Sequence, residues 1–101
     1  MGCCRTIMSQ IKLVNDAIGV AQTAEPEDVL RSLGMYRSLL GTYRISNKLA
    51  RDFRCEIEPE MGRVWSPADM NRYVSRLENF GRSLHLSLVS WASRYCKHQR
   101  N

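Results

Sequence analysis

The 101-residue sequence contains little of what enzymes use for chemistry. It has two histidines, His85 and His98, and neither stands in a pattern typical of a Ser-His-Asp or Cys-His catalytic set. No glycine-rich segment ends in the Lys-Ser or Lys-Thr pair that binds nucleotide phosphates. We therefore predict that the protein is not an enzyme and needs no cofactor.

The spacing of the cysteines does not favour a metal. The four cysteines are Cys3, Cys4, Cys55 and Cys96. No Cys-x-x-Cys pair and no helix-spaced histidine pair is present, so we expect no metal site. No secretory signal precedes the cysteines. The sequence therefore predicts reduced cysteines and a cytoplasmic protein.

Long apolar runs are missing as well. No segment approaches the roughly 20 apolar residues that a membrane-spanning helix requires, which predicts a soluble protein. The first six residues, Met1-Gly2-Cys3-Cys4-Arg5-Thr6, nevertheless fit the pattern for myristoylation of Gly2 with palmitoylation of the neighbouring cysteines. A lipid-anchored adaptor therefore stays open as an alternative, and so does a translation start at Met8.

The apolar residues that are present follow a helical period. Steps of three and four residues predict an all-α protein, a single domain over 1–101 built as a small bundle of three main helices. The expected helices cover about 6–23, 26–56 and 66–96, and a loop covers 57–65. Within the second helix, Gly34 and Gly41 lie seven residues apart on one face and would allow a close backbone approach.

The third helix has the clearest start signal. Ser66 can cap the free N–H groups, Pro67 fits the first helical position, and Asp69 completes a capping box. Residues 84–91 alternate between apolar and polar, which a strand would also do. We prefer a helix there, because the stripe of apolar residues continues on both sides of the segment.

Positive charge dominates the sequence. The net charge is +5, and twelve of the fifteen basic residues are arginines, which suit phosphate and carboxylate partners. In a continuous second helix, Arg37, Arg44, Lys48 and Arg51 would align as one basic ridge. We predict that this ridge contacts an acidic protein surface or nucleic acid. The alternative is a solvated helix face that binds nothing.

Trp65 lies directly before the Ser66 cap. Its side chain could pack on Met70 as a hydrophobic staple, or it could project as an interface anchor, a role in which tryptophan is enriched. We count Trp65 and Pro67 among the predicted partner-binding residues. The Ser66–Pro67 bond is also a possible substrate for a prolyl isomerase, since X-Pro bonds exchange slowly between cis and trans.

The chain resembles the anti-RecBCD accessory proteins of lambdoid phages that infect enteric bacteria. The similarity covers its length, its basic helical character and the segments 8–16 and 63–67, which read MSQIKLVND and RVWSP. The resemblance implies a non-enzymatic inhibitor in the bacterial cytoplasm. Such a protein binds the RecC subunit of the host recombination nuclease and alters its response to Chi, which favours phage recombination.

A second resemblance is more restricted. Residues 33–37 together with Phe53 and Arg54 are similar to the mitochondrial Leu-Tyr-Arg proteins, which would imply binding to an acyl carrier protein. Met35 stands where that motif has leucine, and a whole helix precedes the motif. We keep this resemblance as a minor alternative. Direct nucleic-acid binding through the basic ridge is the rival hypothesis from another functional class.

Overall fold

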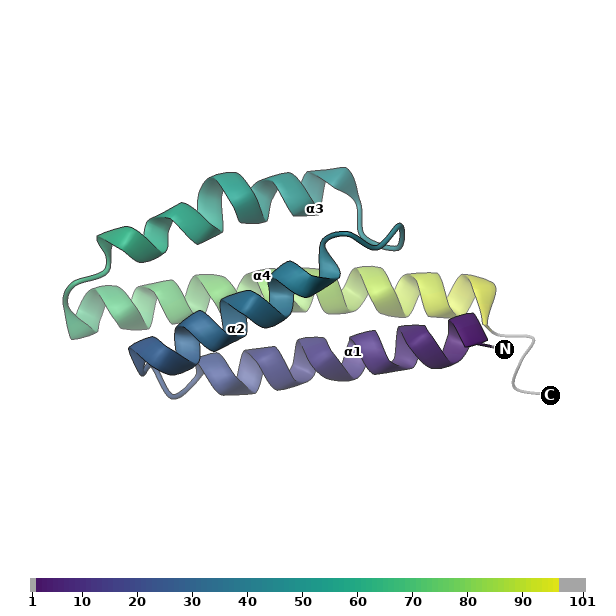
Figure 1. Cartoon of the computed structure of the whole chain (residues 1–101), viewed down its shortest axis with the longest axis horizontal. Helices are drawn as coiled ribbons and strands as arrows, with labels where there is room; N and C mark the ends of the chain where they lie inside the picture. Colours follow the sequence, from purple (N-terminus) through teal and green to yellow (C-terminus); the bar gives the residue numbers. More distant parts are fainter. Residues whose placement is uncertain (1, 97–101) are drawn as a thin grey trace.

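The computed structural model describes residues 2–96 (Figure 1). Two long helices, α1 (Gly2–Ala21) and α4 (Pro67–Tyr95), lie side by side and antiparallel along the molecule. Helix α2 (Pro26–Leu39) packs on α1. A third layer runs back along α4 and consists of α3 (Asn47–Asp52), the π-helical turn η1 (Phe53–Ile57) and the 3-10 helix η2 (Glu58–Arg63). The predicted small all-α bundle is confirmed.

Local signals define the start of α4. The Ser66 hydroxyl accepts a hydrogen bond from the Asp69 backbone N–H at 3.1 Å, and Pro67 occupies the first helical position. The helix then continues without interruption to Tyr95. The helical prediction for residues 84–91 is therefore confirmed, and the strand alternative is wrong.

The expected single helix over 26–56 is wrong. Helix α2 ends at Leu39, a turn follows over residues 40–46, and the chain becomes helical again only at Asn47. Gly41 weakens the helix at this point, and the Ser46 hydroxyl accepts from the Leu49 N–H at 3.2 Å and caps α3. The expected loop over 57–65 is likewise mostly helical, because η2 covers Glu58–Arg63. The first helix also begins earlier than predicted, at Gly2.

The core is organised around an aromatic cluster. The Tyr36 ring meets the Phe53 and Phe80 rings edge-on, at centroid distances of 6.3 and 5.6 Å. Gly81 allows this packing, because a Cβ at its position would lie 2.6 Å from Ile18 Cγ1. The predicted close approach at Gly34 and Gly41 is wrong, since nothing lies within 4 Å of a Cβ built at either position.

Two buried hydroxyl groups join the layers. Ser32 Oγ donates to the Ala17 carbonyl at 2.7 Å and links α2 to α1. Tyr73 Oη donates to the Ile57 carbonyl, also at 2.7 Å, and links α4 to the end of η1. Burial raises the pKa of both Tyr73 and Tyr36 above the ordinary range of a phenol. Both phenols are therefore held in their neutral form.

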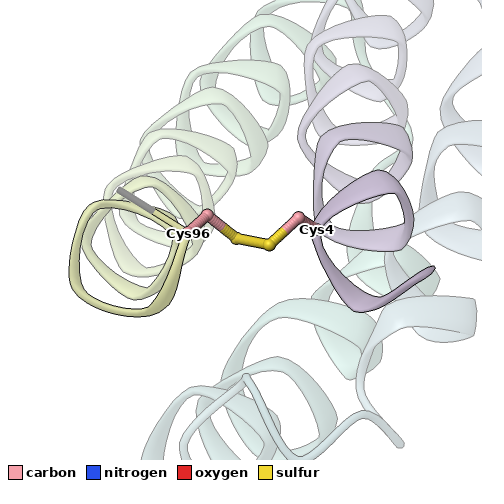
Figure 2. The surroundings of a disulfide bond; sticks show 2 residues. All are labelled: Cys4 and Cys96. Carbon is pink, nitrogen blue, oxygen red and sulfur yellow. A yellow bond between two sulfur atoms is a disulfide. The ribbon is translucent and has the colours of Figure 1, made fainter. Parts of the chain in front are cut away.

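A disulfide joins Cys4 in the first turns of α1 to Cys96 directly after α4 (Figure 2). The two residues are 92 positions apart in the sequence, and their Cα atoms are 5.9 Å apart. The antiparallel arrangement of α1 and α4 brings them together. The prediction of reduced cysteines is therefore wrong for this pair, whereas Cys55 is free and exposed.

Among the helices formed by residues 2–96, none has the length and apolar character needed to cross a membrane.

Candidate protein-binding surface

Trp65 projects from the link between η2 and α4. Val64 before it is extended, with φ −97° and ψ 106°, and its N–H bonds to the Met61 carbonyl. Ser66 after it is also extended, as a helix cap requires. The backbone is thus fixed on both sides of Trp65, a residue that is 77% exposed. This exposure favours the interface-anchor interpretation of Trp65 over the staple.

A hollow of about 450 Å³ lies on one side of Trp65, and we call it the proline hollow. Its lining comes from the α1–α2 turn and from the start of α4: Ala24, Glu25, Pro26, Val64, Trp65, Ser66, Pro67 and Met70. Ala24 turns the chain here with a φ of 60°. Most of the lining is apolar, and Glu25 adds an acidic group.

A second hollow, of about 200 Å³, shares Val64 with the first, and we call it the arginine hollow. Its lining consists of Glu60, Arg63, Val64, Asp69, Arg72, Tyr73 and Arg76. Glu60 is shared by Arg63 at 3.1 Å and Arg76 at 3.7 Å, and Arg72 pairs with Asp69. Three guanidinium groups therefore face two carboxylates, which leaves a local excess of one positive charge.

The predicted basic ridge does not form along one helix. Arg37 belongs to α2 and Lys48 and Arg51 to α3, and the turn over 40–46 separates the two helices. Arg37 Nε donates to Glu58 at 2.7 Å, and Lys48 pairs with Asp52 at 3.0 Å. Among residues 2–96, Arg51 has no ion pair, whereas Arg37 and Lys48 each have one. The alignment prediction was wrong because it assumed one continuous helix.

Arg44 has a different position from the one predicted. Its side chain is only 8% exposed, and its guanidinium lies over the Trp91 ring at 4.6 Å and the Tyr43 ring at 4.8 Å from the centroids. It also donates to Gln10 of α1 at 3.2 Å. Arg44 therefore holds the α2–α3 turn on the middle of α1 and on the last part of α4, and it is not an available contact for a partner.

Of the predicted contact residues, the structure brings Trp65 and Pro67 together on one surface. The Ser66–Pro67 peptide bond is trans. Sequence reasoning did not single out Arg63, Arg72 and Arg76. Arg63 could have been found by its place two residues before Trp65, whereas the other two depend on the way η2 folds back on α4.

Within residues 2–96, no three His, Cys, Asp or Glu side chains are grouped closely enough to hold a metal ion. His85 is half-buried on α4, and the predicted non-catalytic His98 lies outside the described residues.

Comparisons with models of protein families, with curated proteins and with solved structures give no match to this chain.

Proposed function

We propose that this chain is a non-enzymatic binding protein that acts on the RecBCD nuclease in the cytoplasm of an enteric bacterial host. In this proposal it contacts the RecC subunit and alters the response to Chi. The single observation that carries the binding role is the exposed Trp65 at the proline hollow, next to Val64, which also lines the arginine hollow.

The residue types around Trp65 suit a protein partner. Tryptophan and arginine are enriched among the residues that dominate binding energy at protein interfaces. The Trp65 ring needs no induced change to be reached, because the extended backbone on either side already presents it. The ion pairs of Arg63 and Arg72 are exposed, and such pairs are worth about 0–1 kcal/mol. A partner carboxylate can therefore replace them at little cost.

The identity of the partner rests on the resemblance to the phage proteins. One of the two segments that carry it, residues 63–67, coincides with the exposed link that presents Trp65. The other segment, residues 8–16, forms part of α1, where Met8, Ser9 and Lys12 are exposed. The segments that resemble the phage proteins thus include surface positions as well as core positions.

The experiment that tests the proposal measures binding of the purified full chain to purified RecBCD, followed by nuclease assays on linear duplex DNA with and without Chi. We expect W65A to weaken binding by at least about 30-fold, the effect of losing a residue worth roughly 2 kcal/mol. The matched control is L86A, because Leu86 is also a large exposed apolar residue, 68% exposed, on the later part of α4. L86A should bind within about twofold of the unchanged chain.

The possible results separate the two parts of the proposal. If the unchanged chain does not bind RecBCD, the partner is wrong. If it binds and W65A binds equally well, the partner is right and the surface is wrong. A prolyl isomerase acting at Ser66–Pro67 would show in the same assay as a change in the rate of complex formation when the isomerase is added.

Direct nucleic-acid binding makes a different prediction in this experiment. Affinity for DNA alone should fall with salt at a log–log slope near −0.9 per neutralised phosphate. K48E and R51E, which reverse exposed charges on α3, should then weaken binding while W65A does not. The opposite pattern supports the protein–protein proposal.

A further inference from the structure

The Cys4–Cys96 disulfide closes one end of the bundle. It joins α1 to the residue that follows α4, and Figure 2 shows the bond spanning the gap between the two helices. Both cysteines are half-buried, so the bond is not enclosed in the core. A small thiol can therefore approach the sulfur atoms from solution, as thiol–disulfide exchange requires.

Packing around the bond is thin. The fully buried core ends at Ile7 and Leu88. Beyond them, Met8 is 60% exposed, and Cys4 and Cys96 line a hollow of about 390 Å³ with Met8, Ile11, Val89, Ala92 and Ser93. At this end, α1 and α4 are therefore joined by partly buried residues such as Ile11 and Ala92, together with the disulfide.

An aromatic contact also lies close to the bond. Trp91, one turn before Cys96, is half-buried under Arg44 and lies 6.0 Å from the Tyr43 ring. This contact joins the end of α4 to the α2–α3 turn, and the hydrogen bond from Arg44 to Gln10 extends it to the middle of α1. It does not include the first turn of α1, where Cys4 lies.

We propose that the Cys4–Cys96 pair is a redox-sensitive latch for this end of the molecule. A thiolate of a dithiol attacks one sulfur, the Cys4–Cys96 bond breaks, and a mixed disulfide forms. The second thiol of the reductant then displaces the protein cysteine. The protein gains two electrons and two protons as two free thiols, and the dithiol becomes a cyclic disulfide. A low-molecular-weight disulfide reverses the reaction.

Opening the latch frees the first turn of α1 and the last turn of α4, and it opens the hollow between them. The rest of the bundle is retained, because the Tyr36 cluster and the Ser32 and Tyr73 hydrogen bonds lie further along it. Trp65 is at the opposite end of α4 and keeps its surroundings. This inference is independent of the partner assigned above.

The test compares oxidised and dithiothreitol-reduced full-length chain by hydrogen exchange. We expect amides of residues 5–8 and 91–96 to exchange roughly tenfold faster after reduction, and amides around Tyr36 and Leu77 to change little. Emission of Trp91, isolated in a W65F variant, should shift on reduction and return when glutathione disulfide is added. C55S is the matched control, because it removes the exposed thiol of Cys55 in η1 and keeps the latch.

Three results would overturn the latch. Peptide mapping without reductant could fail to show the Cys4–Cys96 link in air-oxidised protein. Exchange of the terminal turns could be the same before and after reduction. Reduction could instead unfold the whole bundle, which would make the bond a global requirement. In the C4S variant, the terminal turns should exchange fast without reduction, and dithiothreitol should have no further effect. If C4S fails to fold, hydrogen exchange of the unchanged chain before and after reversible reduction still tests the proposal.

Discussion

The Tyr36 side chain of α2 packs over Gly81 of α4, at the point where α1, α2 and α4 meet. A Cβ at Gly81 would collide with the Tyr36 hydroxyl and would lie 2.6 Å from Ile18 Cγ1. The same hydroxyl donates to the Leu77 carbonyl at 3.3 Å, which fixes the ring. The close packing of α1, α2 and α4 at this point therefore requires that residue 81 has no Cβ atom.

We expect G81A to lower the free energy of unfolding by about 1–3 kcal/mol, the usual cost of forcing an extra methyl group into a packed core. Urea unfolding followed by circular dichroism measures it. G34A is the matched control, because Gly34 is also within a helix and has nothing within 4 Å of the new Cβ. It should raise the free energy of unfolding by up to about 1 kcal/mol through helix propensity. Equal effects of the two variants would contradict the packing role of Gly81.

Arg44 should matter for stability and not for binding. R44A removes a guanidinium that packs on Trp91 and Tyr43 and bonds to Gln10, so we expect a loss of about 1–3 kcal/mol in the free energy of unfolding. R51A changes an exposed arginine of the nearby helix α3 and should stay within about 0.5 kcal/mol of the unchanged chain. Thermal unfolding of both variants measures the two changes in stability. An R44A protein as stable as the unchanged chain would contradict the proposal that buried Arg44 stabilises the fold.

Features that neighbouring residues encode were predictable from the sequence, whereas features formed by residues far apart in the chain were not. The start of α4 was predictable, because Ser66, Pro67 and Asp69 carry the signal within four residues. The turn over 40–46 was missed although Gly41 and Ser46 mark it, since apolar spacing on both sides suggested one helix. The disulfide and the burial of Arg44 depend on residues far apart in the chain and could not be read from local patterns.

The candidate surface was predictable in part for the same reason. Trp65 and Pro67 belong to one short segment, and its exposure follows from the extended link between two helices. Arg72 and Arg76 join them only because η2 folds back on α4 and Glu60 reaches Arg76. The ridge residues seemed adjacent by helical spacing, and the broken helix separated them.

The Ser66 cap gives a third prediction. S66A removes the acceptor for the Asp69 N–H at the start of the longest described helix, so we expect a loss of about 1 kcal/mol in the free energy of unfolding. S75A replaces an exposed serine inside the same helix and should be neutral or slightly stabilising, since alanine has the higher helix propensity. Chemical denaturation of both variants measures the difference. A loss in S75A as large as in S66A would contradict the capping assignment.

The buried tyrosines predict how stability depends on alkaline pH. Burial raises the pKa of Tyr36 and Tyr73, so in the folded protein both keep their protons at a pH where the unfolded chain, with a phenol pKa near 10, loses them. The unfolded state is then favoured by proton release. Stability from these groups is fully present below about pH 10 and falls above it, at up to roughly 1.4 kcal/mol per pH unit for each tyrosine.

Urea unfolding at several pH values between about 8 and 11.5 measures this slope. Y73F removes one titrating group together with its hydrogen bond to Ile57, so it should be less stable at neutral pH but show about half of the alkaline slope. Y36F should behave in the same way, and the double variant should lose most of the dependence. An unchanged slope in both single variants would mean that these phenols ionise as readily in the folded protein as in the unfolded chain. The hydrogen bonds of Tyr73 to Ile57 and of Tyr36 to Leu77 would then not be the contacts that hold α4 against η1 and α2.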